Sequence, residues 1–169
     1  MTQITASHLA RRSAVLVAGI VAAAAPLAVT VPPASAIPGE WPKVDPADFR
    51  VGGSYYFTSP SGSWKCAIHL DRGAPWAGCQ GAVPAGAPRV SGGGVASIHP
   101  NGGSMTTATP ARFTFYSDTT VEVPRQRVLP YGKLLQVRGI TCSTDPGYGV
   151  NCAGGGHHFT ISTNTYRMG

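Results

Sequence analysis

The sequence predicts an all-β fold, a small antiparallel sandwich or barrel with two local disulfide-stapled hairpins. Three observations lead to this prediction. Glycine and proline, the residues that mark turns, number 22 and 15. Short runs of β-branched and aromatic residues recur between these turns. No segment combines the helical repeat of apolar residues with capping residues at its ends.

The first 36 residues have the features of a secretory signal peptide. Arg11 and Arg12 give a positive start, and an apolar run follows them. Ala34 and Ala36 occupy the small-residue positions of a cleavage site, which predicts cleavage after Ala36. Pro26 interrupts the apolar run and disfavours a membrane anchor, so the cleaved chain is not expected to span a membrane. The paired arginines leave general and twin-arginine export both open.

The remaining residues, 37–169, suit one domain in length. They carry 11 basic and 7 acidic side chains, a net charge of +4. The basic residues are scattered, which argues against nucleic-acid binding, whereas a mild attraction to anionic envelope polymers fits this surplus. Residues 37–50 contain three prolines and predict a Pro-rich lead-in, followed by a single β domain over 51–169.

The first strands are expected at 54–59 and 63–70, with a return strand within 72–81. The second of these alternates clearly and predicts a half-buried strand with one face toward the core. The expected core face carries Trp64, Cys66, Ile68 and Leu70, and the other face Lys65, Ala67, His69 and Asp71.

The middle of the chain is harder to assign. Residues 82–104 are rich in Gly, Pro and Ala, and they predict either an irregular excursion or a pair of weak strands. Their clearest turn is Asn101-Gly102. Strands are then expected at 111–117, with Phe113 and Phe115 on one face, and at 119–124, with Val121 and Val123 together.

The C-terminal part predicts a further hairpin series. A Pro-Tyr-Gly turn within 128–143 leads into a strand that runs to Cys142. Residues 144–149 have the composition of a turn, the chain returns at 150–152, and 157–163 are expected to end the sheet.

All four cysteines lie in this part of the chain, and an even number in an exported protein predicts disulfides. Of three possible connectivities, we favour the local one, Cys66–Cys79 and Cys142–Cys152, because each pair flanks a turn-rich segment. Zinc sites built from cysteines have two to four residues within each pair of ligands, so the intervals of twelve and nine residues do not match them.

Residues 152–158 place a cysteine, three glycines and the pair His157 and His158 close together. Adjacent residues of a strand point to opposite faces, so one metal would not normally bind both histidines. These two residues are therefore weak metal candidates, and no cofactor is expected. The glycines lack the phosphate-loop pattern and predict a turn or bulge after Cys152.

No catalytic residue can be assigned from a motif. The chain has no G-x-S-x-G element, and a triad could only arise if a serine, a histidine and Asp71, Asp118 or Asp145 met in space. The aromatic residues Trp41, Trp76, Tyr148 and Tyr166 lie in irregular surroundings. If these residues are buried, they contribute to packing, which is the interpretation we favour. If they are exposed, they could form a platform for a sugar or a protein partner.

Three segments together resemble a group of small exported actinobacterial proteins of unknown function. They are YFTSPSGSWKCAI, LPYGKLLQVRGITCSTDPGYGVNC and GHHFTISTNTYR, and the resemblance extends from about Tyr56 to Arg167. Ser63 and His158 depart from the pattern of that group, where asparagine and glycine are usual. The group often carries a third, central cysteine pair; its loss here, with Phe115 at one position, supports local pairing of the four that remain. The resemblance implies export and disulfides but no assigned activity.

The sequence thus predicts a non-catalytic binding or interaction module at the cell envelope or outside the cell. Its partner would be an envelope polymer or a protein. The alternative is a small secreted hydrolase or metal-binding protein that uses His157 or His158.

Overall fold

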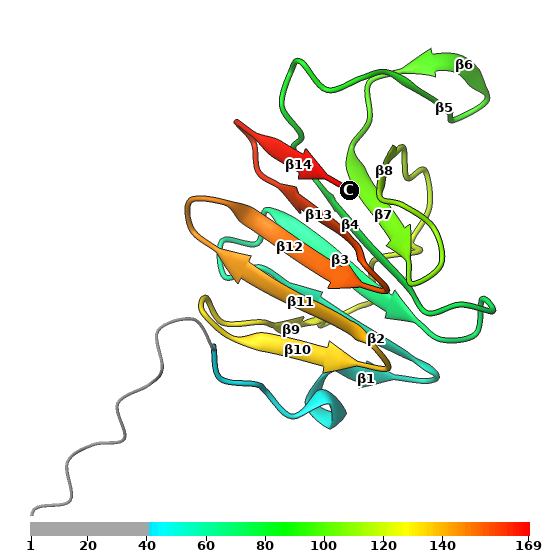
Figure 1. The fold of residues 1–169 in the computed structure, drawn as a ribbon. Coiled ribbons are helices and arrows are strands. Elements are labelled where there is room, and N and C mark those ends of the chain that lie inside the picture. Colours follow the sequence, from blue (N-terminus) through cyan, green and yellow to red (C-terminus); the bar gives the residue numbers. More distant parts are fainter. Residues whose placement is uncertain (1–40) are drawn as a thin grey trace, which may run out of the picture. The chain divides into compact units, whose positions relative to one another are not determined.

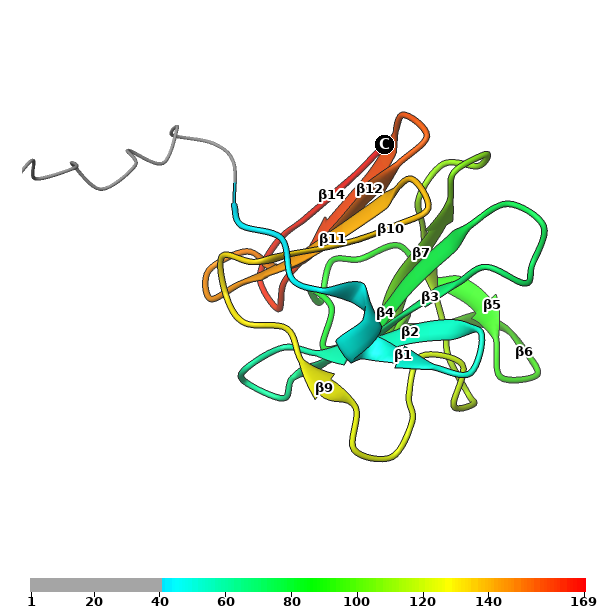
Figure 2. The same ribbon diagram turned by 90° about the horizontal axis from the view of Figure 1, so that it is seen from below.

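Strands alternate with turns throughout residues 41–169, the part of the chain that this computed structural model describes. They form two main sheets that lie face to face around a shared hydrophobic core (Figures 1 and 2). Neighbouring strands are antiparallel except for one short parallel pair. The predicted all-β antiparallel class is confirmed, and of the two architectures it is the sandwich that forms. The predicted signal peptide and its cleavage site lie outside the described residues.

The first sheet has the strand order β1-β2-β3-β4-β7-β8, with β9 parallel to β2. Its strands are β1 (Arg50–Val51), β2 (Ser54–Thr58), β3 (Trp64–His69), β4 (Trp76–Gly81), β7 (Gly102–Thr106), β8 (Arg112–Thr114) and β9 (Arg127–Val128). A separate hairpin is formed by β5 (Val90–Gly92) and β6 (Val95–Ile98), so weak strands are present in the glycine-rich middle of the chain.

The second sheet is a meander in chain order. Its strands are β10 (Leu134–Val137), β11 (Ile140–Asp145), β12 (Gly149–Gly154), β13 (His157–Ile161) and β14 (Tyr166–Met168). The sheet therefore ends one strand later than the sequence predicted, because the chain turns after Ile161, where the Ser162 N–H donates to the Thr165 carbonyl at 2.9 Å.

Both disulfides join directly opposed residues of neighbouring strands. Cys66 of β3 pairs with Cys79 of β4, and Cys142 of β11 pairs with Cys152 of β12. The Cα atoms of each pair are 4.1 Å apart, a spacing typical of opposed residues without mutual ladder hydrogen bonds. All four sulfurs belong to fully buried residues of the core. The predicted local pairing is thus confirmed.

The residues beside these disulfides build the interface between the sheets. In the second sheet a register row of Leu135, Cys142, Cys152 and Phe159 faces inward, and each member is fully buried. In the first sheet the corresponding row is Phe57, Cys66, Cys79 and Gly103. A Cβ on Gly103 would lie 2.5 Å from the Ile161 side chain, so the missing side chain lets β7 and β13 approach closely.

The outward face of β3 departs from its predicted exposure. Ala67 and His69 are buried, because residues 115–126 fold over this face as a cover loop. Val121 of the loop is fully buried and clusters with Ala67 and Tyr116. The strand predicted at 119–124 does not form; Val121 is apolar because it seals a second, small core rather than because it lies in a strand.

Polar side chains hold the cover loop in place. The Gln126 amide donates hydrogen bonds to the carbonyl oxygens of Phe57 and Cys66 on neighbouring strands. Lys65 and Glu122 form an ion pair across the same face. Gln126 thereby attaches the loop to β2 and β3, which is why a segment without ladder pairing can stay ordered there.

Asn101-Gly102 is not the turn that the sequence predicted. Gly102 begins β7, and the Asn101 side chain accepts from the Tyr116 N–H at 2.7 Å and donates to its carbonyl at 2.8 Å. Asn101 thus mimics a strand neighbour for Tyr116. The dipeptide has the composition of a hairpin turn but serves to connect two distant segments.

Residues 41–50, expected as part of a lead-in, belong to the fold. The Val44 N–H donates to the Leu134 carbonyl at 2.9 Å, and the Leu134 N–H donates to the Pro42 carbonyl at 3.0 Å. A short 3-10 helix, η1 (Pro46–Phe49), follows and buries Phe49 in the core. This segment passes from the second sheet to β1 of the first and so covers one edge of the sandwich.

Tyr116 makes the stability of the fold sensitive to alkaline pH. Its buried hydroxyl donates to the Gly103 carbonyl at 3.0 Å, and burial raises the pKa of this phenol above its ordinary value. Above about pH 10 the unfolded chain loses a proton that the folded chain keeps, so the free energy of unfolding should fall by about 1.4 kcal/mol per pH unit. We expect Tyr116→Phe to flatten this decline in urea titrations at successive alkaline pH values. An unchanged slope in the variant would contradict the assignment.

Candidate functional site

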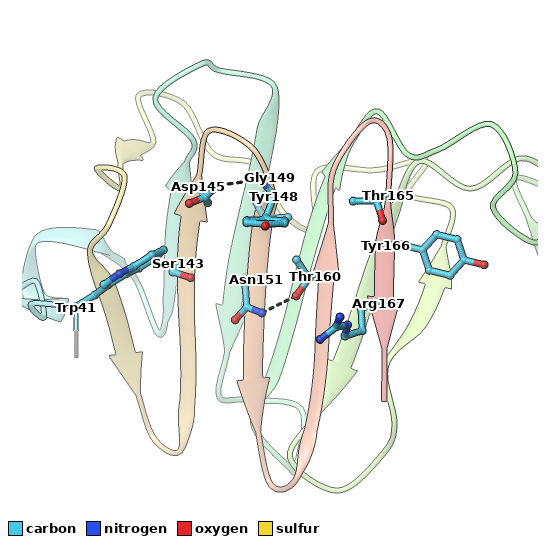
Figure 3. A pocket seen from close by; sticks show the side chains of 11 residues that line it. Trp41, Ser143, Asp145, Tyr148, Gly149, Asn151, Thr160, Thr165, Tyr166 and Arg167 are labelled. Atoms are coloured by element: carbon cyan, nitrogen blue, oxygen red, sulfur yellow. Dashed lines mark hydrogen bonds between the residues drawn. The ribbon is translucent and has the colours of Figure 1, made fainter. Parts of the chain in front are cut away.

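A polar row crosses the outer face of the second sheet. Ser143 on β11, Asn151 on β12, Thr160 on β13 and Arg167 on β14 are successive register partners. Because side chains alternate along each strand, these four share the face opposite the disulfide. Figure 3 shows the row from Ser143 to Arg167. None of its members was singled out from the sequence, because the row exists only once the strands pair in this register.

The two central members of the row are ordered by a direct contact. The Asn151 amide donates to the Thr160 hydroxyl oxygen at 2.7 Å. The Thr160 hydroxyl hydrogen and the Asn151 carbonyl oxygen therefore stay available to a ligand as a donor and an acceptor. On one side of this pair Arg167 is exposed and adds guanidinium donors, whereas Ser143 on the other side is 7% exposed and lies at the floor of the row.

The polar row lies in a shallow hollow of about 510 Å³, which we call the outer hollow. Three aromatic side chains line it: Trp41 beside Ser143, Tyr148 at the β11–β12 turn, and Tyr166 on β14 (Figure 3). Trp41 is 37% exposed and Tyr148 is 67% exposed. What distinguishes these rings from other exposed side chains is that they lie together at one hollow.

A hydrogen-bonded turn positions Tyr148, and a backbone pairing with the second sheet positions Trp41. Asp145 accepts hydrogen bonds from the N–H groups of Gly147 at 2.7 Å and Tyr148 at 2.9 Å, which forms the turn that presents Tyr148. Trp41 directly precedes Pro42, whose carbonyl receives the Leu134 N–H. The segment that looked like a linker in the sequence thus brings an aromatic ring to the second sheet.

The charges of the outer hollow lie at its two ends. Arg167 is exposed and forms no ion pair within residues 41–169. Asp145 lies at the opposite corner, where its carboxylate is engaged by the two backbone N–H groups of its turn. The hollow therefore has a cationic end at Arg167 and an anionic end at Asp145, with neutral hydrogen-bonding groups between them.

The other two aromatic candidates serve different purposes. Tyr166 is 43% exposed and touches the outer hollow, but its ring stacks edge-on against Phe113 at 4.8 Å between centroids. Trp76 packs in the cluster under the cover loop, 5.1 Å from His69 between ring centroids. The preference for packing is thus met by Trp76, whereas Trp41, Tyr148 and Tyr166 are exposed at a common site, with Tyr166 also packed on Phe113.

His157 and His158 lie at the start of β13, directly after the β12–β13 turn. The sequence predicted a turn or bulge after Cys152, and this turn is present. Gly155 and Gly156 form this turn with φ values of 63° and 87°. His158 exchanges backbone hydrogen bonds at 2.8 and 2.9 Å with Gly169, the residue that follows β14. Over residues 41–169 no three His, Cys, Asp or Glu side chains are close enough to hold a metal ion.

The structure brings together one serine–histidine pair that the sequence analysis missed. The Ser54 hydroxyl lies 2.7 Å from His69 Nδ1, and His69 Nε2 lies 2.8 Å from the Thr120 carbonyl. Because that carbonyl can only accept, Nε2 carries the hydrogen, and Nδ1 of the neutral ring accepts from Ser54. Only the β2–β3 register reveals this pair, since the two residues are 15 positions apart.

This pair is not built for catalysis. Ser54 and His69 are 7% and 5% exposed, they lie beneath the cover loop, and neither lines the outer hollow. A nucleophile must be reachable by its substrate, so the geometry assigns the pair to attachment of the cover loop through Thr120.

No match is found among protein-family models, curated proteins or solved structures. The resemblance to exported actinobacterial proteins therefore stays a prediction. Within residues 41–169, no helix has the length and apolar character needed to cross a membrane. The two buried disulfides are consistent with an extracytoplasmic protein.

Proposed function

We propose that the protein is an exported, non-catalytic binding module and that its outer hollow holds a glycan chain of the cell envelope. The observation that carries the proposal is the polar row flanked by two exposed aromatic rings on a rigid sheet. Export is supported by the predicted signal peptide and by the disulfides, since disulfides persist in oxidising compartments.

The chemistry of the outer hollow matches a sugar chain. A sugar ring has apolar faces of C–H groups and a rim of hydroxyls, so it packs on an aromatic ring while its rim needs donors and acceptors. Trp41 and Tyr148 supply the aromatic surface. Asn151 and Thr160, ordered by their mutual hydrogen bond, supply a fixed acceptor and donor between them. A shallow, open hollow admits a chain that continues beyond it on both sides.

A hydrolase that uses the same hollow receives less support. Most glycoside hydrolases need two carboxyl groups on either side of the bond that is cut. Asp145 is the one acidic side chain that lines the outer hollow within the described residues, and its oxygen is already held by backbone N–H groups. His157 and His158 do not line this hollow. The described lining of the outer hollow therefore supports glycan binding more than glycan cleavage.

Calorimetric titration tests the proposal directly. The probes are linear oligosaccharides of glucose, galactose, N-acetylglucosamine and galacturonic acid, each titrated into the oxidised protein without its predicted signal peptide. We expect at least one probe to bind, and we expect Trp41→Ala and Tyr148→Ala each to raise its Kd about tenfold, the equivalent of 1.4 kcal/mol. This size follows from the loss of one aromatic stacking surface.

Tyr131→Ala is the matched control. Tyr131 is 38% exposed, as Trp41 is at 37%, but it does not line the outer hollow. Its replacement should leave the Kd unchanged, and circular dichroism should show all three variants folded. Absence of binding by every probe, or an equal loss in the Tyr131 variant, would overturn the proposed site.

A further inference from the structure

We infer that the glycan carries a carboxylate and that Arg167 binds it at the β14 end of the outer hollow. This inference rests on the proposed function and deepens it from glycans in general to acidic glycans. The structural basis is the position of the guanidinium at the end of the polar row, in register with Thr160, rather than at an unrelated place on the surface.

The polar row gives the ligand a direction. Its members lie on four adjacent strands, so it spans three inter-strand intervals, about 14 Å in total. A chain of a few sugar units can follow such a row, with its hydroxyls hydrogen-bonded to Asn151 and Thr160. The last unit then reaches Arg167, which forms no ion pair within residues 41–169 and can turn its donors to the ligand.

The distribution of charge selects the acidic class and orients it. A carboxylate near Asp145 would be repelled, whereas one near Arg167 is attracted, so the acidic group belongs at the Arg167 end. The net charge of +4 over residues 37–169 favours approach of a polyanion to the molecule as a whole.

The number of cationic groups favours a carboxylate over a phosphate. Arg167 is the one cationic side chain among the described residues that line the outer hollow. A planar guanidinium matches the two oxygens of a carboxylate with two parallel hydrogen bonds. Phosphate groups are typically held by clusters of arginines or by several backbone N–H groups. A single guanidinium on a flat sheet face fits the carboxylate better.

The decisive experiment compares galacturonate oligomers with the galactose oligomers made by reducing their carboxyl groups. Both are titrated into the oxidised protein at the same physiological ionic strength. We expect the acidic oligomer to bind about tenfold more tightly. Arg167→Gln should abolish this preference, because it removes the guanidinium that binds the carboxylate and leaves Trp41, Tyr148 and the Asn151–Thr160 pair in place.

Arg138→Gln is the control for general attraction between charges. Arg138 is exposed at the β10–β11 turn and does not line the outer hollow, so this variant changes the net charge equally and should keep the preference. An equal loss in both variants would mean that long-range attraction alone causes the preference, and it would overturn the role of Arg167.

The remaining outcomes separate this inference from the proposed function. Equal binding of both oligomers would overturn the carboxylate inference and leave the glycan site standing. Binding of neither these nor the other oligosaccharide probes would overturn the proposed function itself. A further outcome is that poly(glycerol phosphate) binds more tightly than galacturonate oligomers and loses this binding in Arg167→Gln. That result would overturn the carboxylate inference and assign a phosphate to Arg167.

Discussion

Replacing all four cysteines by alanine is expected to remove about 6 kcal/mol from the free energy of unfolding. The sequence separations of 13 and 10 residues correspond to about 3 kcal/mol for each disulfide in the chain-entropy model. Domains of this size usually have 5–15 kcal/mol in total, so the variant should keep little stability. For a chain of this length, that loss corresponds to a fall in Tm of roughly 20 °C.

The two disulfides should contribute nearly equally, and paired variants test this. Cys66→Ala with Cys79→Ala opens the β3–β4 hairpin, and Cys142→Ala with Cys152→Ala opens the β11–β12 hairpin. We expect urea titrations to show similar losses, because the two loops are similar in length and both disulfides are fully buried. A large loss in one pair and none in the other would contradict this view of one bond supporting each sheet.

The native protein should resist reduction for the same structural reason. All four cysteines have no exposed surface, so a thiol reagent reaches them only after the sandwich opens. We expect dithiothreitol to leave Tm unchanged over short incubations at 25 °C and to act rapidly once urea is added. The four-alanine variant controls for side effects of the reagent.

The disulfide hairpins were readable from the sequence because their information is local. Cys66 lies in an alternating run, and a turn of Pro and Gly separates it from Cys79. When the strands pair across such a turn, the inward residues meet, so pattern and spacing are sufficient. The turn before His157 was readable on the same grounds, since glycines tolerate its positive φ values.

Features that depend on distant segments could not be read in this way. Val121 is a residue type typical of strands, but it packs on Ala67 of β3, which lies more than fifty positions away in the sequence. Asn101 looks like part of a turn because its side chain resembles backbone, and here it serves as backbone for Tyr116. Local propensity gives the right residue types in both cases, and tertiary contacts decide their use.

The candidate site combines both kinds of information. The sequence predicted strands at 150–152 and 157–163, but it did not predict which of their side chains would share a face. The polar row itself requires the register of four strands, which places Arg167 beside Thr160. Trp41 was named as an aromatic candidate within the predicted lead-in, and only the pairing of Pro42 with Leu134 brings it to the hollow. The aromatic rings were identified as candidates from the sequence, but the polar row and its convergence with these rings were not.

The second sheet thus uses its two faces for separate tasks. Cys142, Cys152 and Phe159 face the core and fix the strands to one another and to the first sheet. Asn151 and Thr160, the immediate neighbours of these residues along the chain, face outward. A rigid inner face holds the outer side chains in place before a ligand arrives, which reduces the entropy lost on binding.

Gly155→Ala is expected to be the most destabilising single substitution in the GGGHH stretch, and Gly156→Ala is its matched control. Both residues have positive φ, so alanine costs about 1 kcal/mol at either position. At Gly156 an added Cβ meets nothing within 4 Å, whereas at Gly155 it would overlap the Thr107 carbonyl beyond β7 of the first sheet. Relieving that overlap requires the backbone to move, which adds about 2 kcal/mol.

The expected result in urea titrations is therefore a loss of about 1 kcal/mol for Gly156→Ala and about 3 kcal/mol for Gly155→Ala. The difference isolates one contact between the sheets, because the turn, the strain and the substituent are the same in both variants. Equal losses would mean that the β12–β13 turn does not approach Thr107 as closely as the structure has it. If the GGGHH stretch had a reactive role instead, substitutions in it would change binding or activity and leave the free energy of unfolding constant. The close approach of Gly155 to Thr107 explains why a glycine is needed at this position. His157 and His158 follow it only because β13 starts there.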